Sequence, residues 1–493
     1  MMMSIQRPYK SMTAFLLCLV ACTAVLRGEP LVLAGQSGEA PETSTLDPRR
    51  MTFPPVEFNP PEPERRVLSN GMIVYLLEDH ELPLVTISAT MRAGGWQDPP
   101  DKIGLASLAG VAMRTGGTQS LSAEGLDEEL ERLAASLAVS IGIESGVATL
   151  DLLKKDLDRG VTIFADVLRR PAFDPGRVDL AKLQTKESIR RRYDQPQGIA
   201  SREFAKLLFG AAHPFARENS VASMTSITRE DLIAFHAAAV HPNGIILGVT
   251  GDFDKDDMVQ KLQRVFEDWK PGNVPTMTLP DIGASEQREV SFVVKPTSQT
   301  HLRAGHLSLK ETDPDYPGLV LLNDILGGGS FRSRLFQDIR TRQGLAYSIS
   351  SVLRPGIHER GVWGMRTETK LSSTQQVIAS LMTNLERLRN EPVSDAELRE
   401  AKDAFVNSFI FSFTSPASIV SRRIQLEYDG LPKDFLQQLR DKVMKLTKED
   451  LLRIARGHLH PDRLKILAVG SADAARVLEA FGDVKEIRLD IEN

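Results

Sequence analysis

The chain repeats part of itself at a constant offset of 219 residues, and this repeat restricts the folds that are open to it. Residues 227–254 read ITREDLIAFHAAAVHPNGIILGVTGDFD, and residues 446–473 read LTKEDLLRIARGHLHPDRLKILAVGSAD. A fixed offset between long segments indicates two copies of one domain. The matched positions are Thr228 with Thr447, Leu232 with Leu451, His241-Pro242 with His460-Pro461 and Gly251 with Gly470, while Pro196 and Ile199 match Pro416 and Ile419 at an offset of 220.

The boundaries of the two copies follow from the repeat and from the prolines. At 493 residues the chain is long enough to bury two full cores. We predict that the N-terminal copy spans residues 56–270 and the C-terminal copy residues 288–493. The segment between them, 271–287, contains Pro271, Pro275 and Pro280, and we interpret it as a linker.

Within each copy, strand patterns come first, helix patterns follow and a strand pattern closes the copy. The dipeptide Asn70-Gly71 lies between apolar residues and is the favoured turn of a tight β-hairpin. This order predicts an α+β fold of two homologous domains, each a mainly antiparallel sheet packed with helices. The expected strands are 67–78, 84–91, 244–251, 289–295, 301–309 and 464–470.

Helices are expected after the first strands of each copy. A buried helix should begin at residue 104, because no ionisable residue occurs from there to residue 113, and another is expected near residues 316–325. Ser122 can cap a further helix. Four leucines would share one face of that helix: Leu126, Leu130, Leu133 and Leu137.

The N-terminus has the pattern of a secretory signal. Arg7 and Lys10 precede an uncharged, largely apolar run over residues 11–26, which is short for a membrane span. The sequence LVAC, ending at Cys22, resembles the bacterial lipoprotein signal, so we predict a signal peptide over residues 1–22 and a lipidated Cys22. An ordinary signal cut near Ala21 or Ala34 is the alternative. Residues 23–55 are rich in proline without apolar periodicity, and we interpret them as a tether.

The charges and cysteines exclude several classes of function. Lys and Arg number 60 against 65 Asp and Glu, which does not favour nucleic-acid binding. Both cysteines, Cys18 and Cys22, lie in the signal segment, so the folded body has no thiol nucleophile and no cysteine metal site. No G-x-S-x-G motif supports a serine hydrolase. His458 and His460 could touch a metal, but His460 repeats His241 at the entry of a strand, which is a structural explanation.

Two motifs resemble the pitrilysin/insulinase family of zinc metallopeptidases. Residues 104–118, GLASLAGVAMRTGGT, resemble the frame of the family's zinc helix. Residues 325–351, ILGGGSFRSRLFQDIRTRQGLAYSISS, resemble the second-half signature of its processing-peptidase branch. The resemblance covers nearly the whole body from about Arg65. It implies that the two homologous domains form one half of a clamshell that closes over a peptide, with zinc on one side only.

The zinc motif of this family is H-x-x-E-H, and its three chemical positions fall on Ser107, Gly110 and Val111. Zinc needs about three protein ligands, and neither Gly110 nor Val111 can supply one. Glu187 lies close to the place of the family's third ligand. We interpret it as a remnant or, in preference, as a solvated helix carboxylate beside Arg190. The resemblance therefore implies no metal in this chain and zinc in a homologous partner subunit.

The opposite side of the clamshell contributes an Arg and a Tyr in this family, and these positions fall on Arg340 and Tyr347. A guanidinium and a phenol hydroxyl can stabilise the negative oxygen that forms in peptide hydrolysis. The alternative is a solvated arginine at a helix end and a buried tyrosine in a strand. Gly327, Gly328 and Gly329 match the family's substrate-facing loop, since glycine lets a peptide approach the backbone closely. A helix C-cap with a tight turn is the other interpretation, and both can hold.

These residues predict the non-zinc-binding subunit of a heteromeric periplasmic metallopeptidase, which supplies Arg340 and Tyr347 to a zinc-bearing homologue. The substrate would be a peptide or an unfolded polypeptide, and the lipid on Cys22 would hold the protein on a membrane of the bacterial cell envelope. The alternative is a non-enzymatic peptide-binding or structural scaffold derived from a peptidase. A self-sufficient peptidase is disfavoured by Ser107, Gly110 and Val111.

Overall fold

In a computed structural model of the chain, the structure describes residues 60–282, 287–329 and 331–490. The helices and strands named below all belong to one compact unit, Asn59–Asn493. The described part of the linker, residues 271–282, forms neither helix nor strand. The signal segment, Cys22 and the tether over residues 23–55 lie outside the described residues.

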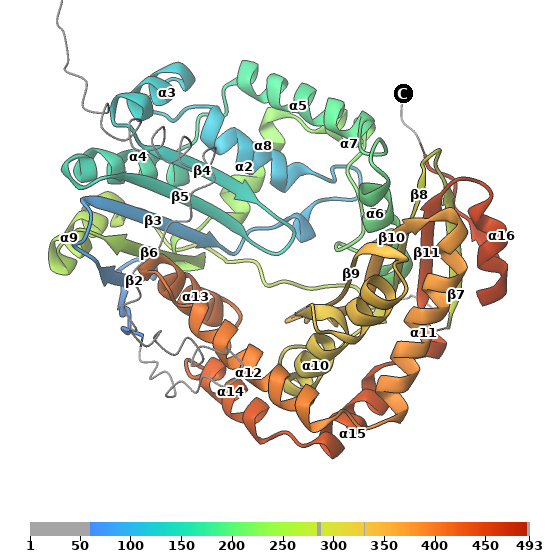
Figure 1. The fold of residues 1–493 in the computed structure, drawn as a ribbon. Helices are drawn as coiled ribbons and strands as arrows, with labels where there is room; N and C mark the ends of the chain where they lie inside the picture. The colour runs from blue at the N-terminus through green and yellow to red at the C-terminus, as the bar shows by residue number, and fades with distance from the viewer. Residues whose placement is uncertain (1–59, 283–286, 330, 491–493) are drawn as a thin grey trace, which may run out of the picture. The chain divides into compact units, whose positions relative to one another are not determined.

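The first sheet has six strands in the order β1-β2-β6-β3-β5-β4 (Figure 1). Four of its strand pairs are antiparallel, and β2 and β6 run parallel. As predicted, β1 and β2 form a hairpin, and Gly71 in their connection has a φ of +85°, which glycine adopts at little steric cost. The bounds are β1 Glu64–Val67, β2 Ile73–Glu78, β3 Leu84–Met91, β4 Ser136–Ile141, β5 Gly146–Leu153 and β6 Ile245–Gly251.

The second sheet also has six strands, in the order β12-β7-β11-β8-β10-β9. The pairs of β7 with β12 and with β11 are parallel, and the other three pairs are antiparallel. The bounds are β7 Glu289–Val294, β8 Gln299–Leu307, β9 Ala346–Arg354, β10 Val362–Lys370, β11 Lys465–Gly470 and β12 Val484–Glu486.

The two sheets repeat one topology, which confirms the predicted α+β fold of two homologous halves. Strands β2, β6, β3, β5 and β4 take the same places as β7, β11, β8, β10 and β9. In each half the His-Pro dipeptide of the repeat leads into a 3₁₀ turn, Pro242–Gly244 or Pro461–Arg463, just before an interior strand. Only one edge differs, where the hairpin strand β1 stands in the place of the C-terminal strand β12.

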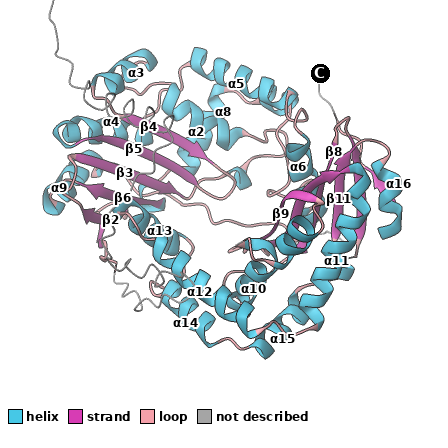
Figure 2. Cartoon of the chain, viewed as in Figure 1, coloured by secondary structure: helices cyan, strands magenta, loops and turns pink. Residues whose placement is uncertain are grey.

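Helices cover one face of each sheet and bury a large apolar core against it (Figure 2). On the first sheet these are α2 Leu105–Thr115, α3 Ala123–Arg132, α4 Leu157–Arg169, α5 Pro175–Arg190, α7 Val221–Ser226, α8 Arg229–Ala239 and α9 Lys255–Phe266. On the second sheet they are α10 Tyr316–Asn323, α11 Thr374–Asn390, α12 Asp395–Phe411, α14 Phe435–Lys445, α15 Lys448–His458 and α16 Ala474–Leu478. The alternation of apolar and polar residues along the strands directs one set of side chains into each core.

Two helices cross from one half to the other and cover part of the opposite faces of the sheets. Helix α6, Pro196–Phe209, belongs to the first half but packs on β8 and β11, where Leu208 is buried. Helix α13, Pro416–Tyr428, belongs to the second half but packs on β2 and β6, where Ile424 is buried. The two halves therefore share two apolar clusters and stabilise each other.

The helix predicted after Ser122 is shorter than the leucine pattern indicated. Ser122 caps α3 as expected, because its hydroxyl accepts a hydrogen bond from the backbone N–H of Gly125 at 3.0 Å. The helix ends at Arg132, and Ala134 takes a φ of +48°, which turns the chain into β4. Leu137 therefore lies on β4, and its assignment to the helix was wrong. A four-residue spacing fits one face of a strand as well as one face of a helix.

Among the described residues, no single helix is both long and apolar enough to cross a membrane. Helices α12 and α13 reach that length and composition only when they are taken together across a bend of 106°. Helix α13 is packed on the first sheet.

Candidate functional site

Helix α2 carries the three positions that correspond to the two histidines and the glutamate of the zinc motif. Ser107 and Val111 lie one turn apart on the exposed face of the helix, and Val111 is 41% exposed. Gly110 is buried because the helix packs against β4. A Cβ atom at this position would meet the backbone nitrogen of Ile141 at 2.8 Å, so the close approach of helix and strand depends on glycine.

These residues do not fit zinc. Zinc sites in proteins use cysteine, histidine or carboxylate ligands, whereas the exposed face of α2 offers a hydroxyl group and an isopropyl group. A glutamate at position 110 would have no room beside β4. Glu187 on α5 is half exposed and forms an ion pair with Arg190 on the same helix, as the interpretation of a solvated carboxylate expects. Helices α2 and α5 therefore offer no chemistry that depends on a metal.

The N-terminus of α2 is held by Asp98, which sequence reasoning missed. Its carboxylate accepts hydrogen bonds from the backbone N–H groups of Gly104 at 2.7 Å and Ala106 at 2.9 Å. Burial raises the pKa of the Asp98 carboxyl group, and these N–H donors act in the opposite direction. A cavity of about 340 Å³ lies beside this end of the helix and includes Ser107 in its lining. Asp98 lies too far before the helix for a capping pattern to reveal it.

Tyr347 lies on β9, an edge strand of the second sheet, at a β-bulge. Thr367 of β10 pairs with Ile349 and Thr369 pairs with Ala346, so two steps along β10 match three along β9. The extra residue interrupts the alternation of the strand, and such bulges redirect a side chain. Tyr347 is 82% exposed, so the alternative of a buried strand tyrosine does not hold.

Arg340 contacts two aromatic rings. Its guanidinium carbon is 4.5 Å from the ring centre of Phe336 and 4.5 Å from that of Tyr347. Such stacking attracts the cation to both rings and orients its plane, while the N–H donors remain at the edge of the plane. In the described part of the chain, the guanidinium has no hydrogen bond and no ion pair. Arg340 is therefore an oriented cation whose donors remain available.

A third aromatic ring extends this arrangement. The ring of Phe331 packs edge-on against Phe336 with 4.8 Å between the ring centres, and Phe331 is 71% exposed. We refer to Phe331, Phe336, Arg340 and Tyr347 as the aromatic–arginine stack. Sequence reasoning found the last two and missed the first two. The four-residue spacing of Phe336 and Arg340 on a helix is a signal that could have found Phe336.

Irregular helical turns position this stack. Arg340 lies in a π-helical segment, Phe336–Arg342, and a second π-helical segment, Asp324–Gly328, directly follows α10. Such turns are rare and occur frequently at functional sites. Burial raises the pKa of the Asp324 carboxyl group to about 6. The stretch that resembles the family signature is thus also the stretch with the least regular helices.

The three glycines predicted to face a substrate lie at the end of this second π-helical segment. Gly327 is buried, and a Cβ atom there would meet the backbone of β9 at 2.7 Å, so this residue allows close packing. Gly328 and Gly329 are exposed. Gly327 therefore allows close packing within the π-helical segment, and the C-cap of the structural interpretation falls on Gly329. Gly328 and Gly329 remain open to a ligand.

His458 and His460 have different neighbours, and the ring of His460 packs edge-on against that of His306. Nε2 of His458 lies 2.9 Å from a carboxylate oxygen of Asp315, and Arg453 donates two hydrogen bonds to the same carboxylate. Together with Asp313, these groups place three potential ligand atoms within 4.8 Å of one another. The hydrogen-bonded guanidinium already neutralises Asp315 and holds its pKa at about 2, so this cluster is an ion-pair network.

Comparisons with known proteins agree with this description. A family model described as "Insulinase (Peptidase family M16)" matches residues 73–210, and one described as "Peptidase M16 inactive domain" matches residues 226–405. The chain is 25% identical over 400 residues to the non-peptidase homolog YmxG of Helicobacter pylori, which covers 80% of this chain and 90% of that protein. It is 23% identical over 368 residues to the uncharacterized zinc protease YmxG of Bacillus subtilis, covering 73% of this chain and 86% of that one.

Solved structures show the same architecture. The peptidase M16 inactive domain from Pseudomonas fluorescens has a TM-score of 0.74 and 25% identity, over 83% of this chain and 98% of that chain. The periplasmic protease PqqL from Escherichia coli has a TM-score of 0.70 and 14% identity, over 92% of this chain and 50% of that chain. The second comparison shows the fold alone, and it shows that this fold accounts for half of a longer protein.

Proposed function

Because the chain belongs to the insulinase (peptidase M16) family, we propose that it is the non-zinc-binding subunit of a heteromeric peptidase. A homologous partner holds the zinc, and this chain supplies the aromatic–arginine stack to the reaction. One observation carries the proposal. Arg340 and Tyr347 lie in contact, and their polar groups have no hydrogen-bond partner within the described ranges.

The chemistry of peptide hydrolysis explains the value of this arrangement. Attack on the peptide carbonyl places negative charge on its oxygen, and donors that are already oriented toward that oxygen stabilise the transition state more than the ground state. The contacts of the Arg340 guanidinium with the rings of Phe336 and Tyr347 restrict its position before a substrate arrives. The hydroxyl of Tyr347, exposed at the bulge of an edge strand, can reach a substrate outside the sheet.

The free edges of the two sheets support a peptide or an unfolded polypeptide as substrate. Strands β4 and β9 are edge strands, and each pairs with one neighbour in the sheets as described. An extended peptide can form backbone hydrogen bonds with such an edge. Strand β9 carries Tyr347, and β4 packs against the helix that bears the zinc-motif positions.

Two observations support a homologous partner: this chain lacks the zinc ligands of the family, and its structural neighbour PqqL is about twice as long as the matched region. Ser107, Gly110 and Val111 cannot hold the metal that the family uses. The fold of this chain covers half of PqqL, so in that protein a comparable length of chain accompanies it. The signal pattern and the periplasmic location in the name of PqqL favour the bacterial cell envelope, with Cys22 as the lipidated anchor.

The second candidate is a non-enzymatic peptide-binding or structural scaffold. The name of the Helicobacter pylori relative, a non-peptidase homolog, favours this possibility. The two candidates differ in the role of the stack. A subunit of a peptidase needs the hydroxyl of Tyr347 for turnover, whereas a scaffold does not.

The test is reconstitution of the chain with its zinc-bearing homologue and measurement of the cleavage of a quenched fluorescent peptide. Tyr347→Phe keeps the ring that stacks on Arg340 and removes only the hydroxyl. We expect kcat to fall about 100-fold or more, since the loss of one oxyanion donor typically has this effect. Arg340→Lys should also lower kcat, because an ammonium group lacks the planar set of donors.

A matched control comes from Tyr193, a half-buried tyrosine of the first half whose ring stacks under Arg202. Tyr193→Phe also removes one hydroxyl from a ring that contacts an arginine, and it should leave kcat unchanged. Complex formation, measured separately by size-exclusion chromatography, should be the same for all variants. Full turnover with both Tyr347→Phe and Arg340→Lys would show that the chain is a scaffold.

A further inference from the structure

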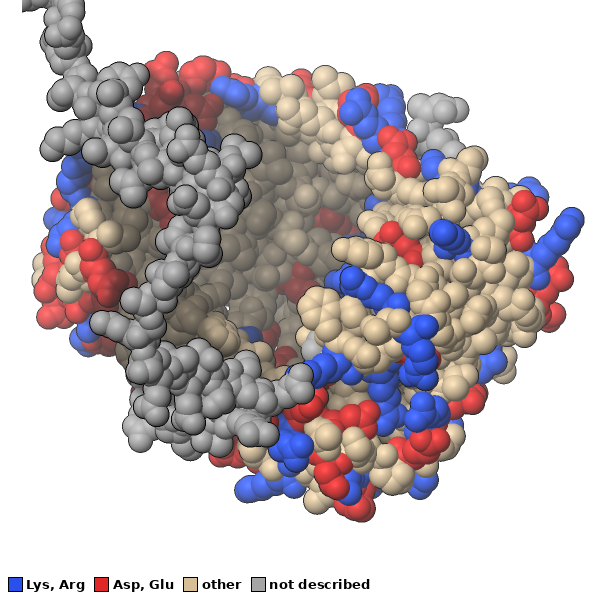
Figure 3. All heavy atoms as spheres, viewed as in Figure 1, with Lys and Arg blue, Asp and Glu red and all other residues tan. Residues whose placement is uncertain are grey.

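A cavity of about 770 Å³ lies between the two halves, and Figure 3 shows the molecule hollowed in this region. Its walls come from α6, from the connection between β4 and β5, and from the β9–β10 hairpin. The charged residues in its lining are the basic Arg303, Arg354, Arg360, Arg366 and Arg422 and the acidic Glu144, Glu311, Glu359 and Asp429.

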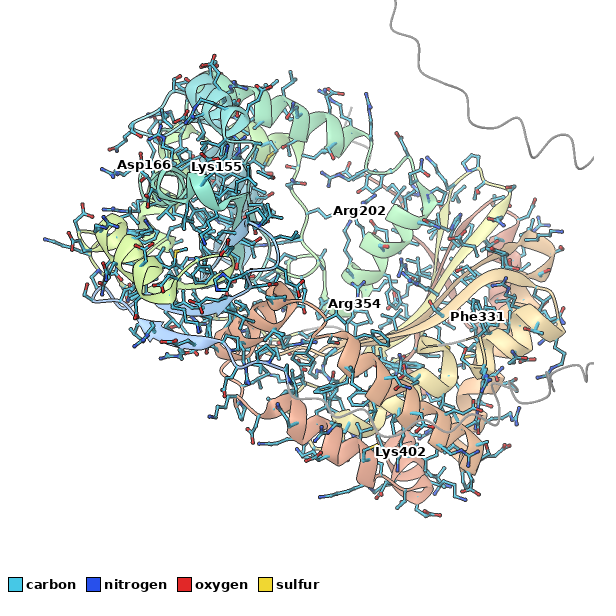
Figure 4. All side chains as sticks on the ribbon, turned by 60° about the vertical axis from the view of Figure 1, so that its left-hand side comes forward. Lys155, Asp166, Arg202, Phe331, Arg354 and Lys402 are labelled. Carbon is cyan, nitrogen blue, oxygen red and sulfur yellow. The ribbon has the colours of Figure 1, made fainter. Side chains whose placement is uncertain are left out.

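Three of these arginines share one face of the second sheet, and we call them the arginine patch: Arg303 on β8, Arg354 on β9 and Arg366 on β10. Arg303 and Arg366 are direct partners across the antiparallel pair of β8 and β10. Arg366 also pairs with Ser350, which lies four residues from Arg354 along β9 and on the same strand face. Figure 4 shows Arg354 near α6, on the side of the second sheet that faces the first half.

The arginines of the patch repel one another. Burial lowers the pKa of the Arg303 guanidinium, and the neighbouring charges of Arg366 and Arg354 lower it further. Like charges at directly opposite positions of neighbouring strands destabilise a sheet. An opposite charge at position 303 or 366 would relieve this repulsion, so the patch is not an arrangement that favours stability.

The contacts of the patch are with neutral groups. Nε of Arg366 donates to the hydroxyl of Ser350 at 3.0 Å, and Arg303 donates to the hydroxyl of Ser201 on α6. Throughout the described ranges, no carboxylate lies within ion-pair distance of these three guanidinium groups. Glu368, two residues along β10 from Arg366, instead contacts Gln197 and lies 3.7 Å from His301.

Three of the acidic residues of the cavity, Glu144, Glu311 and Asp429, form a separate group. Burial raises the pKa of the Glu144 and Glu311 carboxyl groups, and the charge of Asp429 raises both further. The cations that act on these two carboxyl groups are His358 and Arg422, respectively, and not members of the patch. The patch therefore keeps its positive charge.

The same positions of the first half are uncharged. The counterpart of Arg303 in the first sheet is Ser88. Arg303 pairs with a residue of β11 and Ser88 pairs with a residue of β6, and these two partners occupy matching positions of the repeat. By the same registers, Thr149 is the counterpart of Arg366. The first sheet thus has the same topology without arginines at these places. The fold does not require them, so their charge points to a ligand.

We propose that the arginine patch binds the carboxylate side chains of an acidic segment in the polypeptide that this chain holds. The inference rests on the proposed function, because it names the class of peptide that the subunit would bind. Arginine is suited to this task since its planar group can donate two parallel hydrogen bonds to one carboxylate. The net charge of the chain is −5, so the patch is a local feature and not a consequence of overall charge.

The experiment compares two labelled peptides by fluorescence anisotropy with the full chain. One carries glutamates at alternate positions, and the other carries glutamines in their place. At low ionic strength we expect the acidic peptide to bind about 10-fold more tightly, and the difference should shrink as salt is added. Equal affinity of the two peptides would overturn the inference.

Variants locate the binding site. Arg354→Gln combined with Arg366→Gln should abolish the preference for the acidic peptide. The matched control, Arg132→Gln combined with Arg488→Gln, changes the net charge equally at arginines that are 62% and 90% exposed and do not line the cavity, and it should keep the preference. Charge reversal with Arg354→Glu and Arg366→Glu should instead favour a peptide with lysines. Loss of the preference in the control to the same degree would show that overall charge, and not the patch, is responsible.

Reconstituted activity separates this inference from the proposed function. Cleavage of the acidic and the glutamine peptide at equal rates, unaffected by the patch variants, would overturn the patch and leave the peptidase subunit standing. Binding of the acidic peptide that depends on the patch, without any cleavage on addition of the zinc-bearing homologue, would support the patch and overturn the peptidase role.

Discussion

Replacement of Gly110 by alanine tests how tightly helix α2 packs on β4. A glycine in the interior of a helix is normally about 1 kcal/mol less favourable than alanine, so this change would stabilise an unconstrained helix. Here the added Cβ would lie 2.8 Å from the backbone nitrogen of Ile141 and 3.2 Å from the carbonyl carbon of Ser140. A paired strand cannot give way as a side chain end can, and overpacking of this kind costs about 2–3 kcal/mol. The net expectation is a loss of about 1–2 kcal/mol in the free energy of unfolding.

Urea denaturation measures this loss as a shift of the midpoint at constant slope. The matched control is Gly457→Ala in α15, where the added Cβ meets nothing within 4 Å. That variant should gain up to about 1 kcal/mol, since only helix propensity acts. The two substitutions should therefore change stability in opposite directions. A gain of stability in Gly110→Ala would show that helix and strand can move apart, and it would remove the steric reason why a glutamate is excluded there.

Three further substitutions test contacts elsewhere in the structure. The side chain of Glu427 on α13 forms an ion pair with Arg65 at 2.8 Å and contacts Tyr75, and these two interactions hold α13 on the first sheet. Glu427→Gln removes the charge from both interactions, so it should lower the free energy of unfolding, measured in urea, by about 1–3 kcal/mol. Ion pairing holds the pKa of Asp315 at about 2, below its usual 3.8, so the stability it contributes is present above pH 3.8 and is lost as the pH falls toward 2. The advantage of the wild type over Asp315→Asn should shrink across that window in pH-dependent denaturation. Burial raises the pKa of Asp324 to about 6. The stability that the protonated carboxyl group contributes is therefore complete below pH 3.8 and is lost as the pH rises through 6. Asp324→Asn should therefore be more stable than the wild type above pH 6, and equal stability at pH 7 would contradict the burial of this carboxyl group.

The regular part of the fold could be predicted because it rests on periodicity and on the repeat. The apolar strand patterns and the Asn70-Gly71 turn located β2, β3, β6, β7, β8 and β11, and the 219-residue offset indicated two similar halves. Strands β4, β5, β9, β10 and β12 were not predicted. The exchange of α6 and α13 could not be predicted. Pro196 and Pro416 match in the repeat and begin these two helices, but similarity between copies does not say on which sheet a helix packs.

The candidate site could be predicted in its chemistry but not in its geometry. The resemblance identified Arg340 and Tyr347, and it identified the missing ligands on α2. The bulge that exposes Tyr347 depends on the register between β9 and β10, which is a long-range property. The π-helical turn beneath Arg340 and the close packing of Gly110 likewise depend on contacts with distant segments. Local patterns carry no information on such contacts.

The two halves differ in where they leave charged and aromatic side chains without a structural role. In the first half, helix α2 packs closely on β4, and its exposed face carries Ser107 and Val111, which offer no charge. The second half carries Tyr347, which is exposed on β9, and Arg340, whose donors have no partner among the described residues. It also carries a patch of mutually repelling arginines on β8, β9 and β10. Each of these features lowers stability or leaves polar groups without partners, and the same topology forms in the first half without them. Departures from local rules that bring no gain in stability are expected at functional sites. The second sheet and its edge strand β9 are therefore the surface on which a substrate or a partner should first be sought.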